Sequence, residues 1–189
     1  DGDTAVYVVD LPGVYSLAVT PGSGSIDERI ARDYILSGEP DVIVNIVDAT
    51  NLERHLYLTA QILEMRVPMV VALNMTDVAE QLGIEVDAPA LSQRLGCPVV
   101  SMAAAQGRGI DALKDAVNEV ARAGRAPSQT VPFGPVLEPA IARLVKLVGG
   151  IAGERGLDPR WLAVKLLEGE GIARRVTDGI ADLMVASLT

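Results

Sequence analysis

An apolar run near the start of the sequence ends abruptly in an acid, a proline and a glycine, and this stretch most constrains the fold. The run is Val6-Tyr7-Val8-Val9, and Asp10-Leu11-Pro12-Gly13 follows it directly. A short continuous run of β-branched and aromatic residues is typical of a parallel strand buried on both faces. Open α/β sheets bind ligands at the carboxyl ends of such strands. We therefore expect a strand over residues 4–9, with a ligand-binding loop directly after it.

The residue types after this run suit a phosphate site. Asp10 can hold a Mg²⁺ ion, directly or through water, and Gly13 lets a backbone N–H approach a terminal phosphate without a Cβ in the way. The same four residues also form simple turns at strand ends, so this motif alone leaves both interpretations open.

A second polar motif follows a second apolar run. Residues 68–73 read as a buried strand, and Asn74-Met75-Thr76-Asp77 follows it. The Asp77 carboxylate can accept from the ring N1–H and the exocyclic amine of guanine together. Adenine has an acceptor at N1 and no 2-amino group, so it would leave the carboxylate unpaired, at about 1–3 kcal/mol or more. Alternatively, Asn74 or Asp77 caps a short helix through Glu80. The two motifs together favour a guanine nucleotide.

Apolar strands and helix-like segments alternate along the first two thirds of the chain. Besides residues 4–9, strands are expected over 41–47, 69–73 and 98–101, and helices over 26–36, 52–65, 88–95 and 110–123. Ser25 and Glu28 have the spacing of a capping box, and the glycine- and serine-rich loop before Ser25 is expected to be mobile. This alternation predicts an α/β fold with a parallel sheet and right-handed crossovers.

The composition changes after Gly124. Residues 124–135 contain three prolines and two glycines, which is typical of a linker. Every periodic segment beyond it is helical, over about 136–148, from Asp158 through 167, and over about 172–188. Asp158 is a natural N-cap with Pro159 at the first helical position, and Trp161 is expected to pack between helices rather than to anchor an interface. The last third therefore predicts a small all-helical domain.

Composition excludes several classes of function. The formal net charge of −9 argues against nucleic acid as a partner. No run approaches the ~20 apolar residues of a membrane span, and no signal peptide opens the sequence, so we expect this chain to be soluble. The single Cys97 is expected to be a small buried hydrophobe, and the single His55 a surface residue.

With these motifs placed, the chain resembles the cytoplasmic region of FeoB-type ferrous iron transport proteins. In that family a GTPase (G) domain precedes a helical domain similar to a nucleotide-dissociation inhibitor. The matching stretches are 9–17, 27–28 with 33–38, 47–58, 74–77, 91–99, 107–110, and 161–162 with 165–169. The resemblance implies a sheet of the P-loop NTPase type, incomplete here. It also implies a partial G domain over 1–124, a linker over 125–135 and a helical domain over 136–189.

The resemblance also implies a set of nucleotide-binding residues. The expected cofactors are GTP or GDP and Mg²⁺, which Asp10 would hold through a water molecule. The last nucleotide motif, residues 103–105, would contact the base through backbone N–H groups, and residues 17–25 would form the second switch. The expected cofactor-binding residues are Asp10, Leu11, Pro12, Gly13, Asn74, Met75, Thr76, Asp77, Ala103, Ala104 and Ala105.

Several positions depart from the pattern of many GTPases. Val14 stands where a glutamine often orients the attacking water, Met75 replaces a common lysine, and Ala103 replaces a serine. The sequence contains no G-x-x-x-x-G-K-[ST] loop and no lysine before Lys114. That loop supplies most of the phosphate binding and electrostatic catalysis. We therefore predict that this chain by itself neither binds GTP tightly nor hydrolyses it.

The resemblance implies a part of the GTP-binding, GTP-hydrolysing regulatory region of a bacterial Fe²⁺ uptake transporter. Its expected partners are a guanine nucleotide and the transmembrane part of the same transporter, and the resemblance allows a homo-oligomer of the full-length protein. The expected location is the cytoplasmic side of the bacterial inner membrane. The alternative is a nucleotide-free remnant that binds another protein through its helical domain.

Overall fold

A three-stranded parallel sheet forms the centre of the computed structural model, which describes residues 5–17, 25–169, 173 and 177. The strands are β1 (Ile43–Asp48), β2 (Met69–Asn74) and β3 (Val99–Ser101), in the order β1-β2-β3. Residues 69–73 of the central strand are all buried, as expected for a strand covered on both faces.

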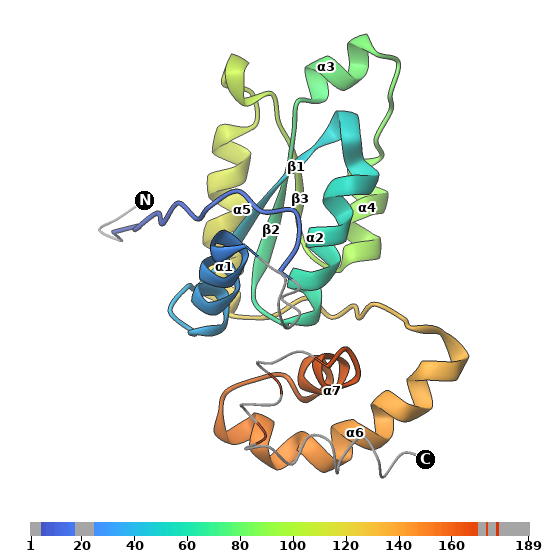
Figure 1. The fold of residues 1–189 in the computed structure, drawn as a ribbon. Coiled ribbons are helices and arrows are strands. Elements are labelled where there is room, and N and C mark those ends of the chain that lie inside the picture. The colour runs from blue at the N-terminus through green and yellow to red at the C-terminus, as the bar shows by residue number, and fades with distance from the viewer. Residues whose placement is uncertain (1–4, 18–24, 170–172, 174–176, 178–189) are drawn as a thin grey trace.

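Helices cover both faces of this sheet (Figure 1). Helices α2 (Leu52–Glu64) and α4 (Ala88–Leu95) lie on one face, and α5 (Ile110–Ala123) lies on the other. Helix α1 (Ile26–Leu36) precedes β1, and the short helix α3 (Thr76–Gln81) follows β2. Two 3₁₀ turns, η1 (Ala49–Asn51) and η2 (Ala104–Gln106), follow β1 and β3. The predicted α/β class is thus confirmed.

Local capping explains where several of these helices begin. The Ser25 hydroxyl accepts from the Glu28 N–H at 3.1 Å, and the Glu28 carboxylate accepts from the Ser25 N–H at 2.8 Å. This is the predicted capping box of α1. The Asp158 carboxylate accepts from the N–H groups of Arg160 and Trp161 and so starts α7 (Pro159–Leu167), also as predicted.

The strand predicted over residues 4–9 is wrong. Residues 5–9 have no regular secondary structure, and Tyr7 and Val8 are 90% and 89% exposed. A strand exists only where a neighbour supplies hydrogen bonds, and β1 pairs within the described residues with β2 alone. The apolar pattern of residues 6–9 is genuine, but no described strand lies beside it. Within the described residues the sheet therefore has three strands rather than the four expected.

The last third of the described chain is helical. Helix α6 (Gly134–Glu154) packs against α7, as Figure 1 shows. We expected this first helix to end near Val148, before two glycines. It continues through Gly149 and Gly150 because Val148 and Ala152 are both fully buried. Of the helix expected over 172–188, nearly all residues lie outside the described part, as do residues 18–24 of the loop expected to be mobile.

A single hydrophobic cluster joins the sheet layer to the helical part. It contains Leu63 and Met65 at the end of α2 together with Trp161, Leu162 and Leu166 of α7. Trp161 is 1% exposed, which confirms the prediction that it packs between helices. Polar contacts add to this junction, since the Arg66 guanidinium donates to the carbonyl oxygens of Pro127 and Gln129. Among the described residues, no helix is both long enough and apolar enough to span a bilayer.

Candidate functional site

The loops after β2 and β3 lie at the same edge of the sheet. The parallel register pairs Asp48 with Asn74 and Leu73 with Ser101 at the carboxyl ends of the strands. Ligands of open parallel sheets bind at this edge. The structure therefore brings together two of the three predicted segments, residues 74–77 and 103–105.

Hydrogen bonds tie these two loops to each other. The Met102 N–H donates to the Leu73 carbonyl at 2.8 Å, and the Met102 carbonyl accepts from the Thr76 N–H at 3.1 Å. The Thr76 hydroxyl donates to the same carbonyl at 2.8 Å. The Asn74 carboxamide oxygen accepts from the Ala104 N–H at 3.0 Å. The two loops thus form one connected unit rather than two independent turns.

The Asp77 side chain projects from the first turn of α3. Its Oδ2 accepts from Nε2 of Gln106 at 2.7 Å, and its Oδ1 accepts no hydrogen bond from the described residues. The N-cap position of α3 belongs to Met75, which makes no side-chain cap. The alternative that Asn74 or Asp77 caps this helix is therefore wrong, because both side chains bond the β3 loop instead.

Met75 has an unusual backbone conformation. Its φ is +62°, in the left-handed region that residues other than glycine rarely adopt. The side chain is 40% exposed at the loop surface. The strain persists because hydrogen bonds of Asn74 and Thr76 fix the chain on either side of Met75. An apolar side chain held at this edge can stack on a flat ring.

Two of the three alanine N–H groups predicted to contact a base have partners inside the protein. Ala104 donates to Asn74, and Ala103 donates to the Arg108 carbonyl at 3.2 Å. No described residue accepts from the N–H of Ala105, which is exposed. Only this third backbone donor can bind a ligand without breaking a bond within the loop.

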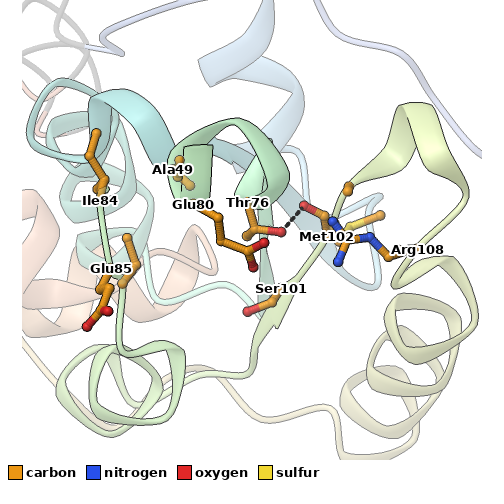
Figure 2. Close-up of a pocket in the computed structure, with 11 residues that line it drawn as sticks. Ala49, Thr76, Glu80, Ile84, Glu85, Ser101, Met102 and Arg108 are labelled. Carbon is orange, nitrogen blue, oxygen red and sulfur yellow. Dashed lines mark hydrogen bonds between the residues drawn. The ribbon is translucent and has the colours of Figure 1, made fainter. Parts of the chain in front are cut away.

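An open cavity of about 430 Å³ lies beside these loops, beneath α3 (Figure 2). Figure 2 shows Glu80 of α3, Ser101 of β3 and Arg108 of the following loop around it. The Thr76–Met102 hydrogen bond forms part of its wall. Neither Asn74 nor Asp77 lines this cavity, so it is distinct from the surface at which Asp77 contacts Gln106.

The third predicted segment, Asp10-Leu11-Pro12-Gly13, does not join the other two. No hydrogen bond of the described residues links it to residues 74–77 or 103–105. Leu11 and Val14 pack against the core, whereas Asp10 and Gly13 are exposed. An exposed carboxylate without a described protein partner suits a Mg²⁺ ion that keeps its water shell, which is the usual behaviour of Mg²⁺.

The residues just after this segment are fastened to α2. The Gln61 carboxamide accepts from the Leu17 N–H at 2.7 Å and donates to the Ser16 hydroxyl at 3.2 Å. The Arg54 guanidinium lies 3.8 Å from the centre of the Tyr15 ring. His55 meets the same ring edge-on.

The sequence interpretation did not identify Gln61 or Gln106. The signal for Gln61 is a polar residue directly before Ile62 and Leu63, at a position that proves 9% exposed. Gln106 gave no such signal, because an exposed polar residue in a glycine-flanked turn is ordinary.

Family comparisons agree with this arrangement. Residues 1–117 match the family described as ferrous iron transport protein B, and residues 133–182 match the FeoB cytosolic helical domain. The Fe(2+) transporter FeoB of Salmonella typhimurium is 43% identical over 187 residues, which is 98% of this chain and 24% of that protein. The same transporter of Escherichia coli strain K12 is 43% identical over 173 residues, which is 91% of this chain and 22% of that protein. The chain thus spans about a quarter of the length of these curated relatives.

Solved structures give the same result. The cytosolic domain of T. maritima FeoB in its GMPPNP form has a TM-score of 0.77 at 30% identity, covering 95% of this chain and 74% of that one. The cytosolic domain of L. pneumophila FeoB has a TM-score of 0.78 at 32% identity, covering 94% and 67%. The Methanococcus jannaschii FeoB G domain is 53% identical, with a TM-score of 0.57 and coverage of 60% and 70%. Because both family models and these relatives span nearly all of the sequence, the chain belongs to the FeoB family of ferrous iron transport proteins.

Proposed function

We propose that this chain forms part of the guanine nucleotide-binding regulatory region of a bacterial Fe²⁺ uptake transporter. The observation that carries this proposal is the connected pair of loops at the sheet edge, where Oδ1 of Asp77 accepts no hydrogen bond from the described residues. A carboxylate in this position can accept hydrogen bonds from the two adjacent N–H donors of guanine. Adenine does not offer this pair of donors, so it would leave the carboxylate unpaired. The solved T. maritima relatives are described in GMPPNP and GDP forms.

The remaining residues have distinct roles in this proposal. Asn74 holds the β3 loop in place through Ala104, and the side chain of Met75 lies against the base. The N–H of Ala105 is the backbone donor to the base. Asp10 holds Mg²⁺ through water, and Gly13 gives a terminal phosphate access to the backbone. When bound, Mg²⁺ supplies positive charge beside the phosphates.

The whole transporter is the setting of this function. The chain's partners are a guanine nucleotide and the transmembrane part of the same transporter, on the cytoplasmic side of the inner membrane, with a homo-oligomer as a further arrangement. Val14 packs against the core and has no group to orient water, so hydrolysis by this region is slow or relies on a group elsewhere to position the attacking water.

Calorimetric titration of the 189-residue chain with GDP and with ADP, in Mg²⁺ buffer, tests the proposal. We expect weak binding of GDP and none of ADP, because the base is read while the phosphates lack a phosphate loop. Asp77→Asn should abolish the preference for GDP. Glu80→Gln removes the same charge from an exposed position three residues along the same helix, and should leave the preference unchanged. Equal binding of GDP and ADP by the unaltered chain would refute the proposal.

A further inference from the structure

The guanine-reading carboxylate already has a hydrogen-bond donor within the protein. Nε2 of Gln106 donates to Oδ2 of Asp77 at 2.7 Å, and the two residues are 29 positions apart in the sequence. Gln106 is exposed and Asp77 is half-buried, so the contact lies at the surface where a ligand would approach.

The chemistry of this contact imitates the ligand. A glutamine carboxamide presents N–H groups on a planar sp² nitrogen, as the exocyclic amine of guanine does. Guanine needs both oxygens of one carboxylate for its two parallel donors. Only Oδ1 lacks a partner among the described residues, whereas Oδ2 carries the Gln106 amide. A base that approaches both oxygens therefore meets the Gln106 side chain at Oδ2.

The backbone of the β3 loop fixes the point from which Gln106 reaches Asp77. The Gln106 N–H donates to the Ala103 carbonyl at 2.9 Å, and Ala103 and Arg108 exchange two hydrogen bonds at 3.2 Å. The Ala104 N–H ties the same turn to Asn74. Because the backbone of this turn is held on both sides, the change that uncovers Oδ2 is a rotation of the Gln106 side chain alone.

We propose that Gln106 is an affinity-determining residue that acts as a latch on Asp77, which guanine must displace in order to bind. The inference rests on the proposed function, because it takes Asp77 as the residue that reads the base. The apparent dissociation constant is the intrinsic constant divided by the fraction of molecules with the latch open. The latch opposes only ligands that use the Asp77 carboxylate, so it lowers the affinity for GDP and leaves that for ADP unchanged.

The expected size of the effect follows from the exposure of the contact. A hydrogen bond to a charged group is strong when buried, but solvent competes for this one. Removing the amide should therefore tighten GDP binding by roughly 3- to 10-fold. The change in ADP affinity should be within error.

The test compares Gln106→Ala with Gln93→Ala, which truncates an exposed glutamine on α4 in the same way. Binding of GDP and of ADP to the 189-residue chain is followed by ¹H–¹⁵N NMR, which measures weak affinities. We expect tighter GDP binding by the first variant only. In an Asp77→Ala background, Gln106→Ala should have no effect. In the unaltered chain, GDP should shift the Gln106 side-chain amide resonances and ADP should not.

Failure of the latch and failure of the proposed function give different results. If the chain prefers GDP over ADP but Gln106→Ala binds GDP equally or more weakly, Gln106 is neutral or orients the carboxylate, and the latch is wrong. If neither the chain nor the variant distinguishes GDP from ADP, the proposed function is wrong and the latch with it.

Discussion

The Arg160 guanidinium donates hydrogen bonds to both oxygens of the Glu138 carboxylate, across the contact between α7 and α6. Its Nη1 donates to Oε2 at 2.9 Å and its Nη2 donates to Oε1 at 2.8 Å. The Phe133 N–H donates to the same Oε1 at 2.9 Å, and Nη2 of Arg160 also donates to the Val131 carbonyl at 3.0 Å. One ion pair therefore joins the start of α6, the start of α7 and the segment that leads into the helical part.

This ion pair predicts a dependence of stability on pH. The hydrogen bonds from Arg160, and then that from Phe133, lower the pKa of Glu138 from its ordinary 4.5 to about 2. Because the folded-state pKa is depressed, the stabilisation is complete above about pH 4.5 and is lost as the pH falls towards 2.

Glu138→Gln tests this dependence. The variant should unfold at lower urea concentration than the unaltered chain at neutral pH, and the difference should shrink as the pH falls from 4.5 to about 2. Glu154→Gln, an exposed change near the other end of α6, is the control and should unfold like the unaltered chain. A constant gap between the Glu138→Gln variant and the unaltered chain across that pH range would contradict the prediction.

Two glycines in the loop after β3 should respond differently to a methyl group. A Cβ on Gly109, whose φ is +84°, would lie 2.5 Å from the Ser101 carbonyl oxygen, whereas one on Gly107, at +71°, would meet nothing within 4 Å. Gly107→Ala should cost about 1 kcal/mol of unfolding free energy for backbone strain alone. Gly109→Ala adds a clash with backbone and should cost roughly 2–4 kcal/mol. Urea unfolding measures both, and equal losses would show that the loop relaxes around the clash.

The link between Asn74 and the Ala104 N–H should control the mobility of the β3 loop. Asn74→Ala removes the acceptor and should raise the hydrogen-exchange rate of the Ala104 amide about fivefold, corresponding to about 1 kcal/mol. Asn74→Asp retains an oxygen at the same position and should restore protection. If the alanine variant exchanges as slowly as the unaltered chain, the hydrogen bond at 3.0 Å does not hold the loop.

Much of the fold could be predicted because its signals are local. Ser25 with Glu28, and Asp158 with Pro159, mark helix starts through groups a few residues apart, and both caps form. The strand β2, apolar except for its last residue Asn74, was likewise recognisable by its composition alone. Residues 6–9 carry an equally clear apolar pattern, yet they form no strand. Strand formation depends on hydrogen bonds to a neighbour, and that information lies outside the segment itself.

The candidate site, like the fold, could be predicted only in part. The sequence placed Asn74 and Asp77 at a strand end, and the structure shows that they lie there. What each side chain bonds could not be predicted, because Ala104 and Gln106 reach them only through the register of β2 with β3. Gly13 and Asp10 could not be placed near the other loops, since the strand expected to position them does not form.

Cys97 should be unreactive in the folded chain. Cys97 is only 7% exposed, and this burial raises the pKa of its thiol from 9.0 to about 11. At pH 8 the thiolate fraction is about 100-fold lower than for an ordinary cysteine. Reaction with a disulfide reagent such as DTNB should therefore be at least about 100-fold slower in buffer than in denaturing urea. Similar rates in the two solvents would mean that the fold does not bury this side chain.

Helix α2, with Arg66 just after it, connects two segments that lie far apart in the sequence. Its 13 residues make a rod about 20 Å long. Arg54 near the start and Gln61 near the end hold the residues that follow Gly13. Just past its last turn, Arg66 holds the segment at 127–129. A tilt of only about 5° at one end of such a rod displaces the other by roughly 2 Å, which is large compared with the tolerance of a hydrogen bond. Tyr15, which Arg54 contacts, and residues 127–129 are therefore attached to opposite ends of one rod, whereas Ser16 and Leu17 are attached to its second half through Gln61.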